Sequence, residues 1–236
     1  MQDDFLREHA LQIRACESFA DGNGTASASS VDAYRNNFTS VHHLLCQLNS
    51  VAAVTRLWRA AGTAYDAVVY LRPDVYFNCP FPVDVLETLA DNTVYVPDFH
   101  HFGGLNDRFA LGRPAAAATW GARLAWALGN CMRTQLHAET LVKRQLADAG
   151  TAAAKLQDFT FLRVRATGAL SARDGALPLC DAAALQRFRR HVERTMTVDE
   201  LAARRVAQAA ERARRRARAA AAAAAAALPP LSLIHI

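Results

Sequence analysis

Two charged side chains close an apolar run near residue 70. The run 67–71 is rich in β-branched and aromatic residues, which favours a buried strand, and Pro73 lacks the N–H that a central ladder needs. Arg72 and Asp74 are therefore expected at the carboxyl end of a strand, where ligands bind in open α/β sheets. A guanidinium suits a phosphate, and a carboxylate suits a divalent cation that carries phosphates. The pair predicts a nucleotide-diphosphate site.

A second group of polar residues lies in the segment 98–108, which is polar, contains two consecutive glycines and predicts a loop. Asn106, Asp107 and Arg108 end this segment. They either shape a turn, because Asn and Asp tolerate unusual backbone angles, or contact a substrate, with Asp107 as general base for an attacking hydroxyl. One of His100 and His101, in the same loop, is a candidate metal ligand or substrate contact, and His101 is the choice for the site.

Glu139 lies in the first turn of a helix expected over residues 137–149. The helix dipole favours a carboxylate at that position in any protein. The same position also makes Glu139 a candidate acidic residue of a site.

The elements that would position these side chains alternate between helices and strands. Helices are expected over 1–20, 38–60, 82–90, from 114 onward and over 137–149, and strands over 67–71, 93–96, 109–112 and 159–164. The helix 38–60 has the clearest pattern, because its apolar residues recur at three- and four-residue steps. These residues are Val41, Leu44, Leu45, Leu48, Val51, Val54 and Leu57. The order predicts an α/β fold with a mixed sheet flanked by helices.

The composition describes a globular body with a basic tail. The chain has 236 residues, of which 52% are hydrophobic, and this length suits one domain with an appendage. Eleven arginines and four carboxylates give residues 187–218 a charge of +7, which leaves −2 for the rest of the +5 chain. We expect an α/β domain over 1–185, a projecting Arg/Ala-rich helical tail over 186–227 and a non-native end over 228–236. The last hexapeptide, 231–236, reads as the translation of a sequencing-library adapter.

Several functional classes are disfavoured by the same sequence. No apolar run is long enough to span a bilayer, and the acidic start lacks the basic and apolar parts of a signal peptide, so we expect a soluble piece. The five cysteines are irregularly spaced and form neither a zinc motif nor a CxxC redox motif. One disulfide stays open as an alternative.

The strand end 67–74 and the segment 99–112 together resemble a family of uncharacterised glycosyltransferase-like proteins of plants, algae and protists. That family has the GT-A fold of nucleotide-diphospho-sugar transferases. It combines a hydrophobic strand ending in Arg-Pro-Asp with a later Gly-Gly-x-Asn-Asp-Arg-Phe segment, here residues 103–109. Residues 161–168 resemble its final strand. The likeness covers about residues 35–170 and none of the tail.

The resemblance implies transfer of a sugar from a nucleotide-diphosphate-sugar donor to a glycan or other hydroxyl acceptor. Arg72 and Asp74 would bind the donor, Asp74 through Mg²⁺ or Mn²⁺. Asp107 and Glu139 would be the catalytic residues. The acceptor would contact Asn106, Arg108 and His101.

Two departures from the family pattern change these expectations. The usual Asp-x-Asp metal motif has Arg72 at its first position, so either Asp74 alone binds the metal beside the substrate phosphates, or Arg72 itself neutralises the diphosphate. Nothing before residue 65 reads as the first nucleotide-binding strand. We therefore expect that an N-terminal βαβ portion is missing and that this fragment is inactive. A membrane anchor in the missing part would place the full-length enzyme in the Golgi or another secretory lumen.

Two other functions remain open at this point. A non-catalytic α/β binding domain agrees with the loss of the Asp-x-Asp motif. The Arg-rich tail could associate with nucleic acid, because a basic stripe attracts phosphate. That association is disfavoured, since the tail has no interleaved aromatic residues and the body carries no basic surface.

Overall fold

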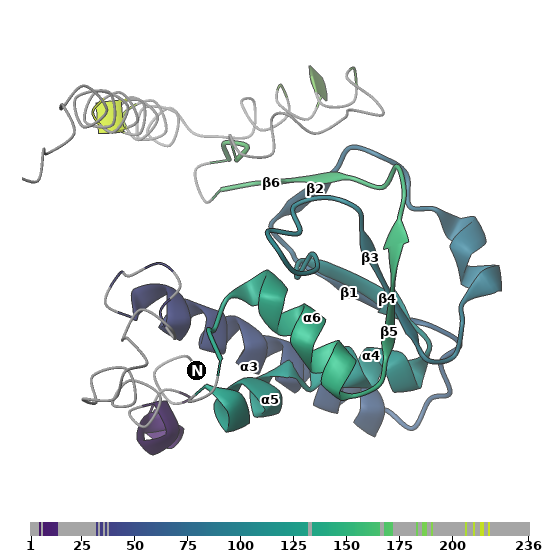
Figure 1. Cartoon of the computed structure of the whole chain (residues 1–236). Coiled ribbons are helices and arrows are strands. Elements are labelled where there is room, and N and C mark those ends of the chain that lie inside the picture. The colour runs from purple at the N-terminus through teal and green to yellow at the C-terminus, as the bar shows by residue number, and fades with distance from the viewer. Residues whose placement is uncertain are drawn as a thin grey trace, which may run out of the picture. The chain divides into compact units, whose positions relative to one another are not determined.

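The structure, a computed structural model, describes most of the chain between residues 38 and 171 (Figure 1). Described are residues 38–131, 134–165 and 168–171, residues 5 and 7–13, and single positions at 32, 34, 36, 183, 186, 187, 190, 206, 210, 213, 214 and 217. The chain divides into two compact units. The first comprises Met1–Pro73 and Cys79–Thr160, and the second comprises Asp74–Asn78 and Phe161–Ile236.

The first unit is built around a four-stranded mixed sheet in the order β1-β4-β3-β5 (Figure 1). Its strands are β1 (Val68–Leu71), β3 (Thr93–Pro97), β4 (Phe109–Gly112) and β5 (Ala152–Leu156). Strand β4 is antiparallel to β1 and to β3, whereas β3 and β5 run parallel. The helices are α3 (Thr39–Ala60), α4 (Pro114–Gly121), α5 (Arg123–Asn130), α6 (Ala138–Asp148) and the 3-10 helix η2 (Val83–Thr88). The expected α/β fold, a mixed sheet flanked by helices, is confirmed.

One face of the sheet packs against α4 and α6. The buried residues of this core are Tyr70, Val94, Val96, Ala110, Ala116, Ala117, Trp120, Val142 and Leu146. Tyr70 ties the edge strand to two helices: its hydroxyl oxygen lies 2.8 Å from Thr55 Oγ1, accepts from Trp58 Nε1 at 3.0 Å, and its ring lies 4.7 Å from that of Trp120. The alanines of α4 let that helix approach the sheet closely.

A second core joins α3, α5 and α6 to the helical residues near the start of the chain. It contains Phe5, Ile13, Val41, Leu44, Leu45, Cys46, Leu48, Leu124, Ala127, Cys131, Leu136 and Leu141. Helix 38–60 was predicted correctly, and so were the α6 helix and the strands at 93–97 and 109–112.

The second unit contains an antiparallel pair, β2 (Val75–Phe77) with β6 (Phe161–Arg163). The strand expected over 159–164 is thus confirmed in a shorter form. The described positions 206, 210, 213, 214 and 217 of the tail are helical and exposed, as expected there. The adapter-like end, 228–236, lies outside the described residues.

Three sequence predictions need correction. Strand β1 is not a buried central strand: it lies at the sheet edge, with Val69 39% and Leu71 57% exposed. The apolar stripe of α3 ends early, because Val54 and Leu57 face solvent. The long helix expected from residue 114 is two helices, α4 and α5, with a break at Ala122.

Two cysteines of the structure take part in disulfides, which sequence spacing could not establish. Cys79 and Cys131 are disulfide-bonded, whereas Cys46 is a buried thiol. Cys16 and Cys180 lie outside the described residues. In the described part of the chain, no helix has the length and apolar character needed to cross a bilayer.

The disulfides predict a simple labelling pattern. In denaturant without reductant, iodoacetamide should modify Cys46 but neither Cys79 nor Cys131, because only a thiol reacts. Both should become labelled after reduction, as read by peptide mass spectrometry. Labelling of Cys79 or Cys131 before reduction would contradict the assignment, and a Cys46→Ala variant gives the matched blank.

Two helical glycines provide an internal comparison of packing. A Cβ on Gly121 would collide with Thr55 Oγ1 and lie 2.7 Å from the Tyr70 hydroxyl, whereas a Cβ on Gly129 would meet nothing within 4 Å. Gly121→Ala should therefore lower the free energy of unfolding by about 1–3 kcal/mol. Gly129→Ala should raise it by up to about 1 kcal/mol, because alanine is the better helix former. Urea denaturation measures both, and equal effects would refute the close packing at Gly121.

Candidate functional site

The predicted site residues Asp107, Arg108 and Glu139 come together in the interior of the first unit. All three are at most 8% exposed. Arg108 lies just before β4, and its guanidinium is 3.8 Å from Asp107 Oδ1 (through Nε) and 3.6 Å from Glu139 Oε1 (through Nη2). Charges buried in this way cost several kcal/mol each unless they are paired. The ionic contacts therefore tie the end of the loop 98–108 to the first turn of α6.

Two histidines hold the same loop from within. Arg108 Nη1 donates to His100 Nδ1 at 2.9 Å, and the backbone N–H of Asn106 donates to His101 Nδ1 at 3.2 Å. A ring nitrogen that accepts a hydrogen bond carries no proton, so both histidines have Nδ1 unprotonated in this arrangement. His101 then donates through Nε2 to Asp98 Oδ1 at 2.9 Å.

Asn106 is fully buried, and its side chain fixes the shape of the loop through two hydrogen bonds. Its side-chain amide donates to the Phe99 carbonyl at 2.9 Å, and its Oδ1 accepts from the backbone N–H of Arg108 at 2.9 Å. This structural role is the turn-shaping alternative that the sequence left open, and it leaves the predicted acceptor contact of Asn106 untested.

Asp98 clamps the beginning of the loop to β5. Its carboxylate receives Lys155 Nζ at 2.8 Å, His101 Nε2 and Gln157 Nε2 at 2.9 Å. Lys155, followed by His101 and Gln157, holds the pKa of this exposed carboxyl well below its usual range. The loop is thus held at both ends, by Asp98 at the surface and by Arg108 in the interior.

Three further residues of the network were missed by sequence reasoning: Gln47, Arg123 and His137. Gln47 Nε2 of α3 donates to Asp107 Oδ2 at 3.0 Å. Arg123, at the start of α5, is 1% exposed, and its Cζ lies 3.5 Å from the centroid of the Trp120 ring. Burial lowers the pKa of Arg123 from 12.5 to about 10, an effect opposed by the Asp107 carboxylate. Arg123 is therefore a buried cation at neutral pH.

His137 caps α6 beside Glu139, with Nε2 3.5 Å from Glu139 Oε2. Burial lowers the pKa of His137 below 6.5 and outweighs the attraction of Asp107. With His137 neutral, the two guanidiniums of Arg108 and Arg123 balance the two carboxylates of Asp107 and Glu139. Protonation of His137 would add an uncompensated charge to this buried network.

The two donor-binding residues predicted from the strand end belong to different units of the structure. Arg72 directly follows β1, as expected, and is half-buried in the first unit; Asp74 is half-buried in the second unit, just before β2. Three or more His, Cys, Asp or Glu side chains that could hold a metal ion do not occur together among the described residues. The described residues therefore do not form a protein-only metal cage, and a cation on Asp74 alone stays a prediction.

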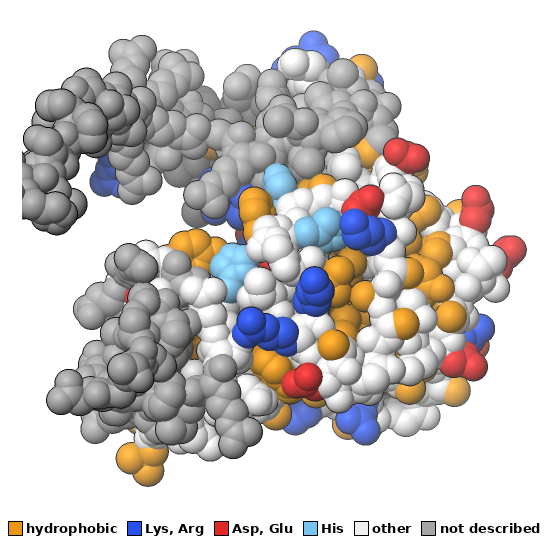
Figure 2. All heavy atoms as spheres, viewed as in Figure 1, with side chains coloured by type: hydrophobic (Ala, Val, Ile, Leu, Met, Phe, Trp, Pro, Cys, Tyr) orange, Lys and Arg blue, Asp and Glu red, His pale blue; other side chains and the backbone are white. Residues whose placement is uncertain are grey.

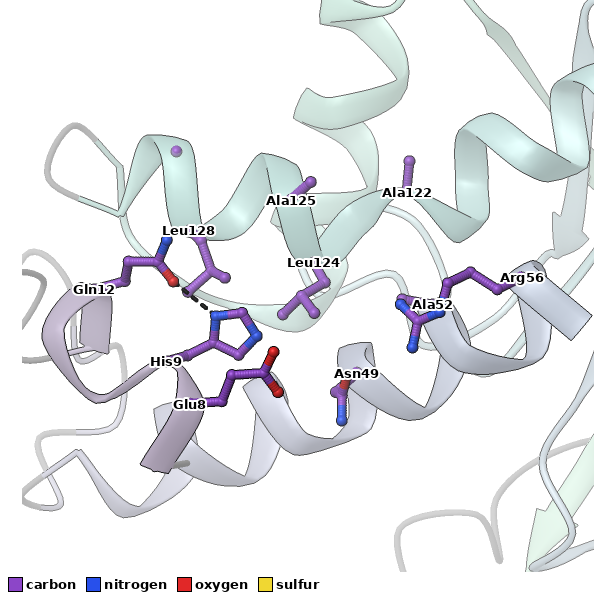
Figure 3. Close-up of a pocket in the computed structure, with 11 residues that line it drawn as sticks. Glu8, His9, Gln12, Asn49, Ala52, Arg56, Ala122, Leu124, Ala125 and Leu128 are labelled. Carbon is purple, nitrogen blue, oxygen red and sulfur yellow. Dashed lines mark hydrogen bonds between the residues drawn. The ribbon is translucent and has the colours of Figure 1, made fainter. Parts of the chain in front are cut away.

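A groove of about 710 Å³ lies elsewhere in the first unit, between the residues near the start of the chain, α3 and α5 (Figure 3). Glu8, His9 and Gln12 stand at one end and Arg56 at the other, with leucine and alanine side chains along α5 between them. Its size suits a small molecule. None of the predicted site residues lines it.

The outer face around α6 carries charges of both signs. Figure 2 shows Lys or Arg side chains and histidines over α6 and beside it, together with Asp or Glu side chains. The exposed basic residues of α6 and β5 are Lys143, Arg144 and Lys155, and α6 ends in the exposed carboxylate of Asp148. Lys155 is paired with Asp98.

Comparison with known proteins adds one match. The family model of a domain of unknown function, DUF7796, matches residues 51–167, which include every predicted site residue. No curated protein and no solved structure matches the chain. The family description names no activity, so the resemblance to glycosyltransferases stays a prediction.

The burial of His137 predicts a pH dependence. The unfolded state binds a proton near pH 6.5, but the folded state does so only at lower pH, so folding stability should fall as the pH drops from 7.5 to 5.5. His137→Gln should reduce this loss, measured by urea denaturation at both pH values. His43→Gln, at an exposed position of α3, is the control. A pH dependence of His137→Gln equal to that of the wild type would show that burial of this ring does not perturb it.

Proposed function

We propose that the protein is a glycosyltransferase-like enzyme that transfers a sugar from a nucleotide-diphosphate-sugar donor to a hydroxyl acceptor. The observation that carries the proposal is the buried pairing of Asp107 and Glu139 through Arg108. Residues 106–108 belong to the Gly-Gly-x-Asn-Asp-Arg-Phe segment, and Glu139 is the acidic helix residue of the same resemblance. Arg108 and Glu139, which are far apart in the sequence, lie within ion-pair distance, as do Arg108 and Asp107.

Asp107 is the best candidate for the general base. Gln47 and Arg108 each contact a different oxygen of its carboxylate, which fixes its orientation. A carboxylate so oriented can accept the proton of an attacking hydroxyl once the acceptor reaches it. Glu139 and Arg108 position it, and His101 and Asn106 shape the loop that an acceptor would approach.

Arg72 and Asp74 remain the proposed donor-binding residues. A guanidinium at the end of β1 can offset the charge of a leaving diphosphate without a second carboxylate. A divalent cation, Mg²⁺ or Mn²⁺, would supply further charge neutralisation on the diphosphate through Asp74. No step of the proposed chemistry is assigned to that ion.

The disulfides support the proposed compartment. Disulfides persist in the secretory pathway and are rare in the cytosol, so disulfide-bonded Cys79 and Cys131 fit a Golgi or other secretory lumen. A membrane anchor would have to lie outside the described residues, where the proposal places it, upstream of the sequence given.

Activity measurements test the enzyme proposal directly. In the full-length protein, release of nucleoside diphosphate from a panel of UDP- and GDP-sugars should fall by about 10²–10⁴-fold in Asp107→Asn, the range typical of a lost general base. Asp74→Ala should lower it through weaker donor binding. Asp91→Asn changes a carboxylate whose side chain is 94% exposed and should leave activity intact. Asp107→Asn with full activity would remove Asp107 from the mechanism.

A non-catalytic binding domain is the second candidate, and the groove of Figure 3 favours it. In that case nucleotide sugars would bind without release of nucleoside diphosphate, as measured by calorimetry, and Arg56→Ala would weaken binding while Asp107→Asn would not. Association of the Arg-rich tail with nucleic acid has no observation in its favour among the described residues.

A further inference from the structure

The loop before β4 contains two side chains on strained backbone. His100 has φ 52° and Phe102 has φ 43°, in the left-handed region that residues other than glycine rarely adopt. Each such conformation costs about 1 kcal/mol or more and persists only where the surroundings enforce it. Backbone strain of this kind concentrates at ligand sites, so its location needs an explanation.

The contacts that enforce this conformation are made by the residues that follow Phe102 in the loop. The backbone of Gly104 lies so close to that of Glu139 that a Cβ would collide with the Glu139 carbonyl, and Leu105 N–H donates to the same carbonyl at 2.9 Å. Gly104 N–H also donates to the His101 carbonyl at 2.7 Å. The loop is therefore fixed to the first turn of α6.

The strain holds an aromatic ring at the surface. Phe102 is 50% exposed, although a phenylalanine is normally buried. Its ring stacks on that of His100, with centroids 5.3 Å apart and planes inclined by 19°. His100 in turn accepts from Arg108 at 2.9 Å, so Phe102 is connected through one imidazole to the buried network that contains Asp107.

Polar groups lie near the start of the same loop. Asp98 and His101 of the loop form a hydrogen-bonded group with Lys155 of β5 and with Gln157, and Asp98 and Lys155 are exposed. An exposed apolar ring in a loop that also offers donors and acceptors matches a pyranose, which has an apolar C–H face and a rim of hydroxyls. A nucleobase could also stack on the ring, but the exposed Asp98 carboxylate of the loop disfavours the phosphate of a nucleotide.

We propose that Phe102, supported by His100, is a stacking platform for a pyranose ring of a glycan acceptor. The role of this sugar as an acceptor rests on the proposed function. The binding of a sugar to the ring does not require catalysis. Phe102 is a binding residue and takes no part in the proposed chemistry.

Saturation-transfer NMR tests the platform with defined probes. Methyl β-galactopyranoside, methyl β-glucopyranoside and methyl α-mannopyranoside present different C–H faces, and uridine serves as the competing ligand. Irradiation of the aromatic protons should transfer magnetisation to the C–H protons of at least one glycoside. Phe102→Leu should reduce this transfer at least fivefold, while Phe102→Tyr should retain it. Transfer to none of the glycosides, or to uridine alone, would overturn the proposal.

Phe102→Gly separates binding from folding. Glycine relieves the positive φ, so the melting temperature should be unchanged or raised, while the transfer to the glycoside is lost. Tyr65→Leu, which removes another partly exposed ring of the first unit, should leave the transfer unchanged. Transfer that survives in Phe102→Gly would refute the platform.

The failure of this proposal and that of the proposed function give different results. Asp107→Asn should still bind the glycoside, because the platform precedes chemistry. Sugar binding without release of nucleoside diphosphate from any donor would keep the platform and reject the enzyme. Donor turnover that Phe102→Leu does not affect, together with unchanged saturation transfer, would keep the enzyme and reject the platform.

Discussion

The buried guanidinium of Arg108 is the group on which the arrangement of the candidate site depends. It contacts its neighbour Asp107, Glu139 of α6 and the imidazole of His100. A cation at 8% exposure is tolerated only where opposite charge is supplied. That requirement holds the loop 98–108 against α6. The same contacts bring the carboxylates of Asp107 and Glu139 to one guanidinium and restrict their orientations.

The charge balance extends beyond these three residues. A second buried cation, Arg123, rests on the Trp120 ring and interacts with Asp107, so two cations face two anions. The lowered pKa of His137 follows from its burial, which the nearby Asp107 carboxylate opposes but does not overcome. Within the described residues, Arg123 Nη1 and Nη2 and His137 Nδ1 have no hydrogen-bond partner. Buried polar atoms without a protein partner are commonly satisfied by an ordered water or by a polar group of a ligand.

The sequence predicted the elements whose signals are local. The first half of helix α3 has a buried apolar stripe, α6 ends two residues before Gly150, which has φ 65°, and β1 ends before Pro73. Strand β5 was missed because Ala152–Leu156 has no β-branched residue, and its position depends on pairing with β3. The break at Ala122 was missed because the alanine-rich sequence around it favours a continuous helix.

The same distinction applies to the site. Asp107, Arg108 and Glu139 could be chosen from motif spacing, but Gln47 and Arg123 come from helices whose burial only the tertiary structure decides. Arg123 meets Trp120 across the break between α4 and α5, where its Nε donates to the Trp120 carbonyl at 3.0 Å, and no signal in the sequence marks that break. Edge position, likewise, is not encoded in β1 itself: the apolar run 67–71 would suit a central strand equally well.

The burial of Asp107 sets a condition on any chemistry that it performs. At 5% exposure, its carboxylate can accept a proton from an acceptor hydroxyl only if groups packed around it move. Gln47 of α3 and Arg108 each contact one of its oxygens, and Arg108 is itself tied to Glu139 and to His100. The contacts that fix the orientation of this candidate base therefore also limit the approach of its substrate.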